Sequence, residues 1–245
     1  MPNRFIKGCI LVVFLAVAVF LIYPSAYVEE SPGDTYNILG NDNSGKKYID
    51  FPKADENEKG ELMLLTVAVS GASTYFSSAT ALPALFQKSS DLYPREAYYP
   101  PNTSNQQVQE KNAEDMQNSE SSALIAAKNY LKEKNIDFDD KGAKIQIDDV
   151  GGPSAGLVFT LGILQKAGID ITQGRRIAVT GTIDNNGKVG AIGGVQQKMI
   201  AAYRDGASVM VVPKENISEL EDIPNIEIIA VDNLSDAVNK LTSNN

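Results

Sequence analysis

The 245-residue chain contains no histidine and a single cysteine, Cys9. Without histidine a Ser-His-Asp triad cannot form, and a Cys-His pair is excluded for the same reason. One cysteine also excludes a disulfide within the chain. Any nucleophilic serine in this protein must therefore give its proton to a base other than histidine, and lysine is the side chain that burial can convert to a neutral base.

Two further features are missing. The chain has 31 acidic and 22 basic residues, and no stretch is basic enough to suggest a nucleic-acid partner, because an acidic surface repels phosphate backbones. No G-x-x-x-x-G-K-[ST] stretch occurs, so we expect no P-loop and no ATPase module on this chain. We likewise expect no cofactor and no metal.

The N-terminal residues 1–28 carry Arg4 and Lys7 before an uncharged run from Gly8 to Tyr23. A membrane span needs ~20 apolar residues and a signal-peptide core ~7–15, so the length lies between the two. No good A-x-A cleavage site follows, which favours an uncleaved signal anchor over a cleaved signal peptide. The two basic residues predict a single-pass protein in the cell membrane, with a cytoplasmic N-terminus and the remainder outside.

The most informative stretch is Asp148–Leu157, with the sequence Asp-Asp-Val-Gly-Gly-Pro-Ser-Ala-Gly-Leu. Gly151 and Gly152 free the backbone, and Pro153 suits the first position of a helix. The hydroxyl of Ser154 should therefore stand at a helix mouth among unpaired N–H groups. Such a place suits a bound phosphate or the oxyanion that forms when a serine attacks a carbonyl.

A second stretch, Gly190–Ala202, should open a helix and place Lys198 near its first turn. Helical spacing puts Lys198 on the same face as Val195, Ala201 and Ala202, which would normally turn inward. The positive end of the helix dipole and an apolar surface both favour the neutral amine. The alternative is a side chain that extends its charged head to water.

Together, Gly-Pro-Ser-Ala-Gly, the glycine-rich run Gly187–Gly194 and Lys198 resemble the catalytic domain of Lon-family serine proteases. The spacing suits that family, whose Ser-Lys dyad falls on Ser154 and Lys198. The resemblance is greatest to membrane-anchored bacterial Lon-like proteases that contain a PDZ domain. It covers residues 113–242 well and residues 31–70 more loosely. The connection before the serine loop is too short for a PDZ domain, so the chain looks like a Lon-like protease without one.

This resemblance implies roles for five residues. Ser154 would be the nucleophile and Lys198 the base, while backbone N–H groups of Ser154 and of the Gly151-Gly152 loop would hold the oxyanion. Thr180 matches a threonine that lies near the lysine in the family and could orient the amine, although it also reads as an ordinary strand residue.

The residue before Gly-Pro-Ser departs from part of the family. Many Lon proteases have an acidic residue there, whereas this chain has Gly151, with Asp148 and Asp149 further back. Gly-Gly-Pro-Ser agrees with the membrane-anchored subgroup. Whether either aspartate assists the dyad stays open.

The pattern of the chain predicts an α+β fold. Strands and helices interleave, but Asp184-Asn185-Asn186-Gly187 is a strong hairpin turn, so we expect a partly antiparallel sheet. The resemblance implies a two-layer domain related to the second domain of ribosomal protein S5. We expect strands at 62–69, 144–148, 176–183, 208–213 and 226–231, and helices at 113–135, 154–167, 195–202 and after Asn233, which caps the last one.

The domains expected are an anchor at residues 1–28, an extracytoplasmic stem with at most short strands at 29–59, and the protease domain at 60–245. Residues 70–112 are the least legible part. Their tyrosine-proline cluster, around Tyr93 and Tyr98, is either a binding lip or a loop packed against the body.

These expectations describe an ATP-independent, membrane-anchored serine endopeptidase that cleaves exported or surface proteins and peptides. The family's ring assembly implies a possible homo-oligomer. Two alternatives stay open: a catalytically silent module that binds partners at the cell surface, and a phosphate-binding enzyme similar to small-molecule kinases.

Overall fold

The computed structural model describes residues 2–24, 26–50, 59–75, 77–79, 89–137, 142–147, 150–221 and 225–243. Asp148 and Asp149 lie outside these ranges. The chain divides into two compact units, which we call unit 1 (Met1–Ser31 with Ala68–Val108) and unit 2 (Pro32–Val67 with Gln109–Asn245). Strands β1 and β3 each continue from one unit into the other.

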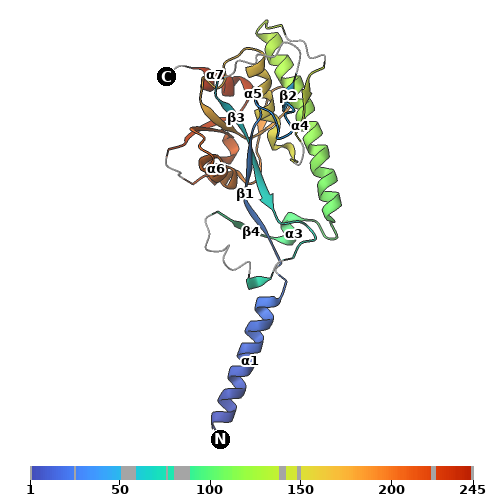
Figure 1. Ribbon diagram of the computed structural model, residues 1–245, viewed down its shortest axis with the longest axis vertical. Coiled ribbons are helices and arrows are strands. Elements are labelled where there is room, and N and C mark those ends of the chain that lie inside the picture. Colours follow the sequence, from blue (N-terminus) through green and yellow to red (C-terminus); the bar gives the residue numbers. More distant parts are fainter. Residues whose placement is uncertain are drawn as a thin grey trace. The chain divides into compact units, whose positions relative to one another are not determined.

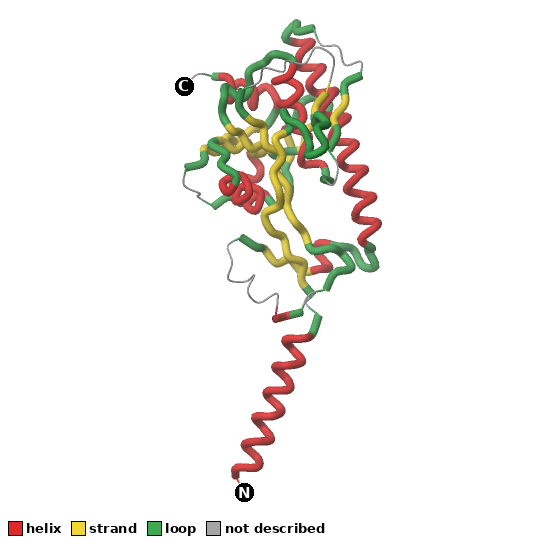
Figure 2. The backbone as a smooth tube through the Cα atoms, viewed as in Figure 1, coloured by secondary structure: helices red, strands yellow, loops and turns green. Residues whose placement is uncertain are grey.

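The main sheet has the strand order β10-β9-β6-β3-β1-β4, and Figure 2 shows β1 and β3 as its longest strands. The pairs β3/β6, β6/β9 and β9/β10 are parallel, whereas β1 and β4 are antiparallel. The prediction of a partly antiparallel sheet is therefore confirmed. The six strands are β1 (Tyr27–Asn37), β3 (Glu61–Val69), β4 (Asp91–Pro94), β6 (Arg176–Val179), β9 (Val209–Pro213) and β10 (Glu227–Val231).

Helices cover both faces of the sheet in unit 2, as Figure 1 shows. Leu62 and Leu64 point into a core shared with α4, α5 and α7, while Met63 and Leu65 point to the opposite face and pack with α6. The sheet therefore carries helices on both faces, whereas the sequence led us to expect a two-layer arrangement. Parallel strands buried on both faces read as continuous apolar runs rather than as alternation. The four helices are α4 (Asn105–Glu133), α5 (Gly156–Lys166), α6 (Val195–Arg204) and α7 (Leu234–Thr242).

Strand β1 occupies residues 29–37 of the stem expected at residues 29–59, where the sequence predicted at most short strands. Pro32 and Gly33 disfavour a strand by local propensity, which is why the sequence did not reveal it. The register with β4 ends at Glu30, so Pro32 lies beyond that pairing. At Gly33 a Cβ would collide with Thr66 on β3, so only glycine lets the two backbones approach so closely.

The strand expected at residues 176–183 is two strands. The backbone leaves β6 through Gly181, whose φ of +152° favours glycine, and β7 (Thr182–Ile183) then pairs with β8 (Val189–Gly190) as a separate hairpin. The side chain of Asp184 accepts hydrogen bonds from the backbone N–H groups of Asn186 and Lys188 and closes the predicted turn.

The remaining elements are short, apart from α1. The predicted cap of α7 is confirmed, because Asn233 Oδ1 accepts a 2.9 Å hydrogen bond from the N–H of Asp236. The other elements are α1 (Pro2–Ile22), β2 (Ile49–Asp50), which pairs with β5 (Lys144–Ile145), α3 (Arg95–Tyr98), and the 3₁₀ helices η1 (Pro153–Ala155) and η2 (Lys214–Glu219).

Helix α1 is long and apolar enough to cross a membrane. The segment Arg4–Ile22 has 19 residues, a mean hydropathy of 2.9 and no buried residue. At ~1.5 Å per residue it matches a hydrocarbon core of ~30 Å. A signal sequence would look the same, so both interpretations of the N-terminus stand.

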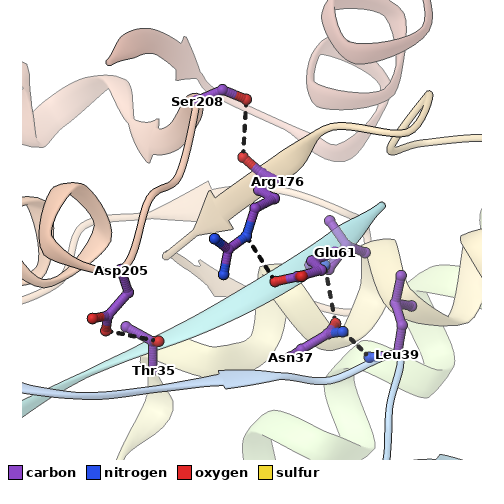
Figure 3. Close-up of polar contacts among 8 residues, drawn as sticks. Thr35, Asn37, Leu39, Glu61, Arg176, Asp205 and Ser208 are labelled. Carbon is purple, nitrogen blue, oxygen red and sulfur yellow. Dashed lines mark hydrogen bonds and ion pairs between the residues drawn. The ribbon is translucent and has the colours of Figure 1, made fainter. Parts of the chain in front are cut away.

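Polar side chains link several unit 2 elements around the starts of β3 and β6, as Figure 3 shows. Arg176 at the start of β6 binds Glu61 at the start of β3 at 3.0 Å, and its carbonyl accepts from Ser208. Asp205, at the end of α6, accepts a 3.0 Å hydrogen bond from Thr35 on β1. Asp205 also pairs with Arg204 at 2.7 Å. These contacts hold the end of α6 against the sheet.

We expect Asp205→Asn to lower the free energy of unfolding by about 1 kcal/mol at pH 7, because it removes a carboxylate that accepts three hydrogen bonds, one from Thr35 and two from Arg204. The hydrogen bond from Arg204 lowers the pKa of Asp205, with a further contribution from Thr35. The stabilisation is therefore complete above the unfolded pKa of ~3.9 and is lost as the pH falls through the lower folded value.

Urea unfolding between pH 7 and pH 2 tests this, with Asp232→Asn as the control because its ion pair with Lys214 is exposed. The difference between wild type and Asp205→Asn should shrink towards low pH. A difference that does not change with pH would contradict the assignment.

Candidate active site

Ser154 lies in the short helix η1, directly before the buried helix α5. Gly152 enters η1 with a φ of +101°, a conformation that favours glycine, and Pro153 occupies the first helical position. Ser154 itself is half-buried, so a substrate can reach it. The predicted turn into a helix mouth is confirmed.

Helix α4 holds the serine loop from one side. The N–H of Gly152 donates a 3.0 Å hydrogen bond to the carbonyl of Asn112, and Ser119 Oγ donates to the carbonyl of Pro153 at 3.3 Å. A Cβ on Gly151 would lie only 2.5 Å from the Cβ of Asn112. Loop and helix are therefore in direct backbone contact, which requires glycine at position 151.

The end of β6 holds Ser154 from the other side. Gly181 donates its N–H to the carbonyl of Ser154 at 3.0 Å and accepts a hydrogen bond of 3.0 Å from the N–H of Leu157. These two bonds fix the start of α5 to the carboxyl end of a central strand, where α/β sheets commonly place their sites.

Lys198 is the fourth residue of α6 and is 3% exposed. The helix starts after Gly194, which adopts a left-handed conformation, and the N–H of Lys198 donates to the carbonyl of Gly194 at 2.9 Å. Val195 and Ala202, on the same face, lie in the core beneath the sheet. The side chain does not extend to water, so that alternative is wrong.

The structure brings the side chains of Lys198 and Ser154 together. Lys198 Nζ lies 2.9 Å from Ser154 Oγ, which is hydrogen-bond distance. Removal from water disfavours the charged form of an amine. A neutral amine at this distance is able to take the hydroxyl proton of a serine.

Asn216, which the sequence did not single out, braces the segment before α6. Its side-chain amide accepts from the N–H of Ile192 at 3.0 Å and donates to the carbonyl of the same residue at 2.9 Å. Asn216 is 2% exposed and also binds Glu219 at 2.7 Å. An asparagine in a polar stretch carries no local signal for such a role, because the contact joins residues 24 positions apart.

Thr180 and Gly152 do not form the interactions expected of them in this arrangement. Thr180 Oγ1 is buried and has no hydrogen-bond partner, so it does not bind the Lys198 amine. The N–H of Gly152 is already used by Asn112. The supporting roles of Thr180, Gly151 and Gly152 stay predictions. Asp148 and Asp149 are outside the described residues.

Among the residues that the structure describes, no group of three or more His, Cys, Asp or Glu side chains gathers in a way that could hold a metal ion.

Comparison with known proteins places the site in a family context. Residues 90–243 match the model of the Lon protease (S16) C-terminal proteolytic domain. The chain is 34% identical over 163 residues to the Lon protease of Malacoplasma penetrans, covering 62% of this chain and 21% of that protein. It is 32% identical over 135 residues to Lon protease 2 of Herpetosiphon aurantiacus, covering 50% and 16%. It is 40% identical over 89 residues to the Lon protease of Rickettsia typhi, covering 34% and 11%. The chain thus spans about a fifth or less of the length of these relatives.

We expect Gly151→Ala to lower the free energy of unfolding by about 1–3 kcal/mol, because the new methyl group has to displace Asn112 or the loop. Gly193→Ala is the matched control, since a Cβ there meets no atom within 4 Å. Thermal or urea unfolding of both variants measures the difference. Equal stability of the two variants would show that loop and helix are not in this contact.

Proposed function

Because the chain belongs to the Lon protease (S16) C-terminal proteolytic domain family, a family of serine-type endopeptidases, we propose that it cleaves peptide bonds with Ser154 as nucleophile and Lys198 as general base. One observation carries this proposal: the 2.9 Å separation of Lys198 Nζ from Ser154 Oγ, with the lysine 3% exposed. With no histidine in the chain, the adjacent amine is the base that this arrangement offers.

The reaction would proceed in two halves. Ser154 Oγ attacks the peptide carbonyl while the neutral amine of Lys198 takes the hydroxyl proton. The resulting ammonium protonates the leaving amine, the C–N bond breaks, and an ester on Ser154 remains. Water then attacks the ester with Lys198 again as the base, releasing the new carboxyl terminus.

Stabilisation of the oxyanion would come from the backbone of the serine loop. The N–H of Ser154 lies at the start of η1, where helical N–H groups lack partners within the helix. The N–H of Gly152 becomes a second donor only after leaving the Asn112 carbonyl. Each such donor is worth ~3–4 kcal/mol in comparable enzymes, which is enough to compensate the loss of one ordinary hydrogen bond of ~1 kcal/mol.

The setting of the reaction is also proposed here. The apolar helix α1 would anchor the protein in the cell membrane, with its N-terminus in the cytoplasm and unit 2 outside. Substrates would then be exported or surface proteins and peptides. Because the chain carries no Walker A sequence, these would be segments already flexible or exposed, and no nucleotide would be consumed. A homo-oligomeric ring, as in the family, is part of the same proposal.

We expect Ser154→Ala and Lys198→Met to abolish cleavage of casein or of short peptides by the full chain, because each removes one partner of the 2.9 Å contact. Lys198→Arg should be inactive as well, since a guanidinium stays protonated and cannot act as a base. Lys188→Met is the matched control, because Lys188 lies exposed in the hairpin turn and should leave activity unchanged.

Two outcomes would contradict the dyad: full activity of either variant at Ser154 or Lys198, or loss of activity in the Lys188 control. A wild-type chain that binds proteins without cleaving them would favour the silent binding module instead.

We expect cleavage rates to be the same with and without ATP and magnesium. A continuous peptidase assay, run beside a phosphate-release assay, checks both halves of this statement. Stimulation by ATP, or hydrolysis of the nucleotide by the purified chain, would overturn it and would favour the phosphate-binding alternative.

A further inference from the structure

The end of helix α1 is fixed to the folded part of unit 1. The carbonyl of Tyr23, the residue after α1, accepts hydrogen bonds from the N–H of Ser78 at 3.1 Å and from its hydroxyl at 3.3 Å. Pro24 forms an antiparallel bridge with Ser77, and the chain enters β1 at Tyr27. The two residues directly after the helix, Tyr23 and Pro24, are therefore held by Ser77 and Ser78.

Four tyrosines of unit 1 have their side chains in solvent. Their exposed fractions are 67% for Tyr23, 47% for Tyr27, 61% for Tyr75 and 37% for Tyr93. We call these four residues the tyrosine surface. Unit 1 covers these rings only in part: Tyr75 lies against Arg95, and the ring centroid of Tyr93 lies 5.8 Å from that of Tyr98. The exposed part of each ring is apolar surface that a partner outside unit 1 could cover.

Arg95 connects the tyrosine surface to the end of α1. Its backbone N–H donates to the carbonyl of Ala26 at 2.8 Å, and its guanidinium lies 4.3 Å from the ring centroid of Tyr75. The same guanidinium donates to the carbonyls of Thr74 and Tyr27, at 2.5 and 3.5 Å. Arg95 thereby ties the ring of Tyr75 and the backbone of Tyr27 to the residues that follow α1.

The other two tyrosines of the cluster behave differently. Tyr98 donates its hydroxyl to Glu30 at 3.0 Å, and Tyr99 donates to the carbonyl of Ser70 at 2.9 Å. Burial raises the pKa of both phenols, and the nearby carboxylate of Glu30 raises the pKa of Tyr98 further. Tyr98 and Tyr99 are thus hydrogen-bonded within unit 1, whereas the four residues of the tyrosine surface are more exposed. The ring of Tyr93 lies between the two groups, 5.8 Å from that of Tyr98.

We propose that the tyrosine surface contacts the headgroup region of the lipid bilayer that α1 enters, so that unit 1 is seated on the membrane. The proposal rests on the membrane anchoring proposed above. A span of 19 residues has the length of the hydrocarbon core, which places Tyr23 at the level of the headgroups. Tyrosine suits that level because its ring is apolar and its hydroxyl can bind water or lipid.

This seat gives Tyr75 and Tyr93, which belong to the least legible part of the sequence, a role at the end of α1. The lipid bilayer is the one partner that is necessarily present there once α1 is inserted.

The chain contains no tryptophan, so a single introduced tryptophan reports on one place only. The experiment uses three variants of the full chain in phosphatidylcholine vesicles: Tyr75→Trp on the tyrosine surface, Val13→Trp within α1, and Tyr203→Trp in unit 2. Tyr203 is the matched control, because it is a tyrosine with an exposed fraction of 48%. Emission is quenched with lipids that carry a nitroxide on the headgroup or bromine atoms deep in the acyl chain.

We expect headgroup nitroxide to quench Tyr75→Trp at least about twofold more strongly than Tyr203→Trp, since indole and phenol both favour the interface. Deep bromines should quench Val13→Trp. Equal headgroup quenching of Tyr75→Trp and Tyr203→Trp would overturn the proposal.

The Val13→Trp result then shows which part failed. If it is quenched, α1 inserts and only the seat is wrong; if it is not, the membrane anchor is wrong as well. A variant without a new aromatic ring, Tyr27→Ser with Tyr75→Ser, gives a second measurement. In vesicles, its residues 71–75 should exchange their amide hydrogens faster than those of the wild type. Without lipid, the two chains should exchange at the same rate. Unchanged exchange in vesicles would count against the seat.

Discussion

A 2.9 Å contact between an amine and a hydroxyl, Lys198 Nζ and Ser154 Oγ, is the constraint around which unit 2 is arranged. The two residues belong to helices on opposite faces of the sheet, since α5 packs in one core and α6 in the other. Their side chains can meet only where the strands of the sheet end and both helices begin. The carboxyl end of β6 supplies that meeting point, because Gly181 there is hydrogen-bonded to both Ser154 and Leu157.

Burying a lysine is unfavourable unless its environment compensates the loss of water. Here α6 carries Lys198 on its core-facing side. The burial of Val195, Met199 and Ala202 on the same helix offsets the free-energy cost of burying the lysine. Hydrogen bonds keep the starts of the helices in place. Asn216 binds the segment before α6, and Asn112 and Ser119 of α4 bind the serine loop. In this way long-range contacts of modest energy position one short contact.

The helices and most strands of unit 2 could be predicted from local patterns. The apolar runs of β3 and β9, the turn at Asp184 and the cap at Asn233 are each specified by residues next to one another in the chain. Strand β1 could not, because Pro32 and Gly33 oppose a strand locally and its pairing with distant strands overrides that preference. The hairpin β7–β8 was predicted, but its separation from the main sheet depends on the bend at Gly181.

By itself the sequence determined the chemistry that is available: with no histidine, a serine in a glycine loop and a lysine on an apolar helix face, an amine is the base within reach. It also determined an N-terminal helix long enough for a bilayer. Only the tertiary structure decided that the two side chains meet, that the N–H of Gly152 is engaged by Asn112, and that Thr180 Oγ1 does not bind the amine. The reason is that composition and helical period are local properties, whereas a hydrogen bond between residues 44 positions apart depends on how every intervening element packs.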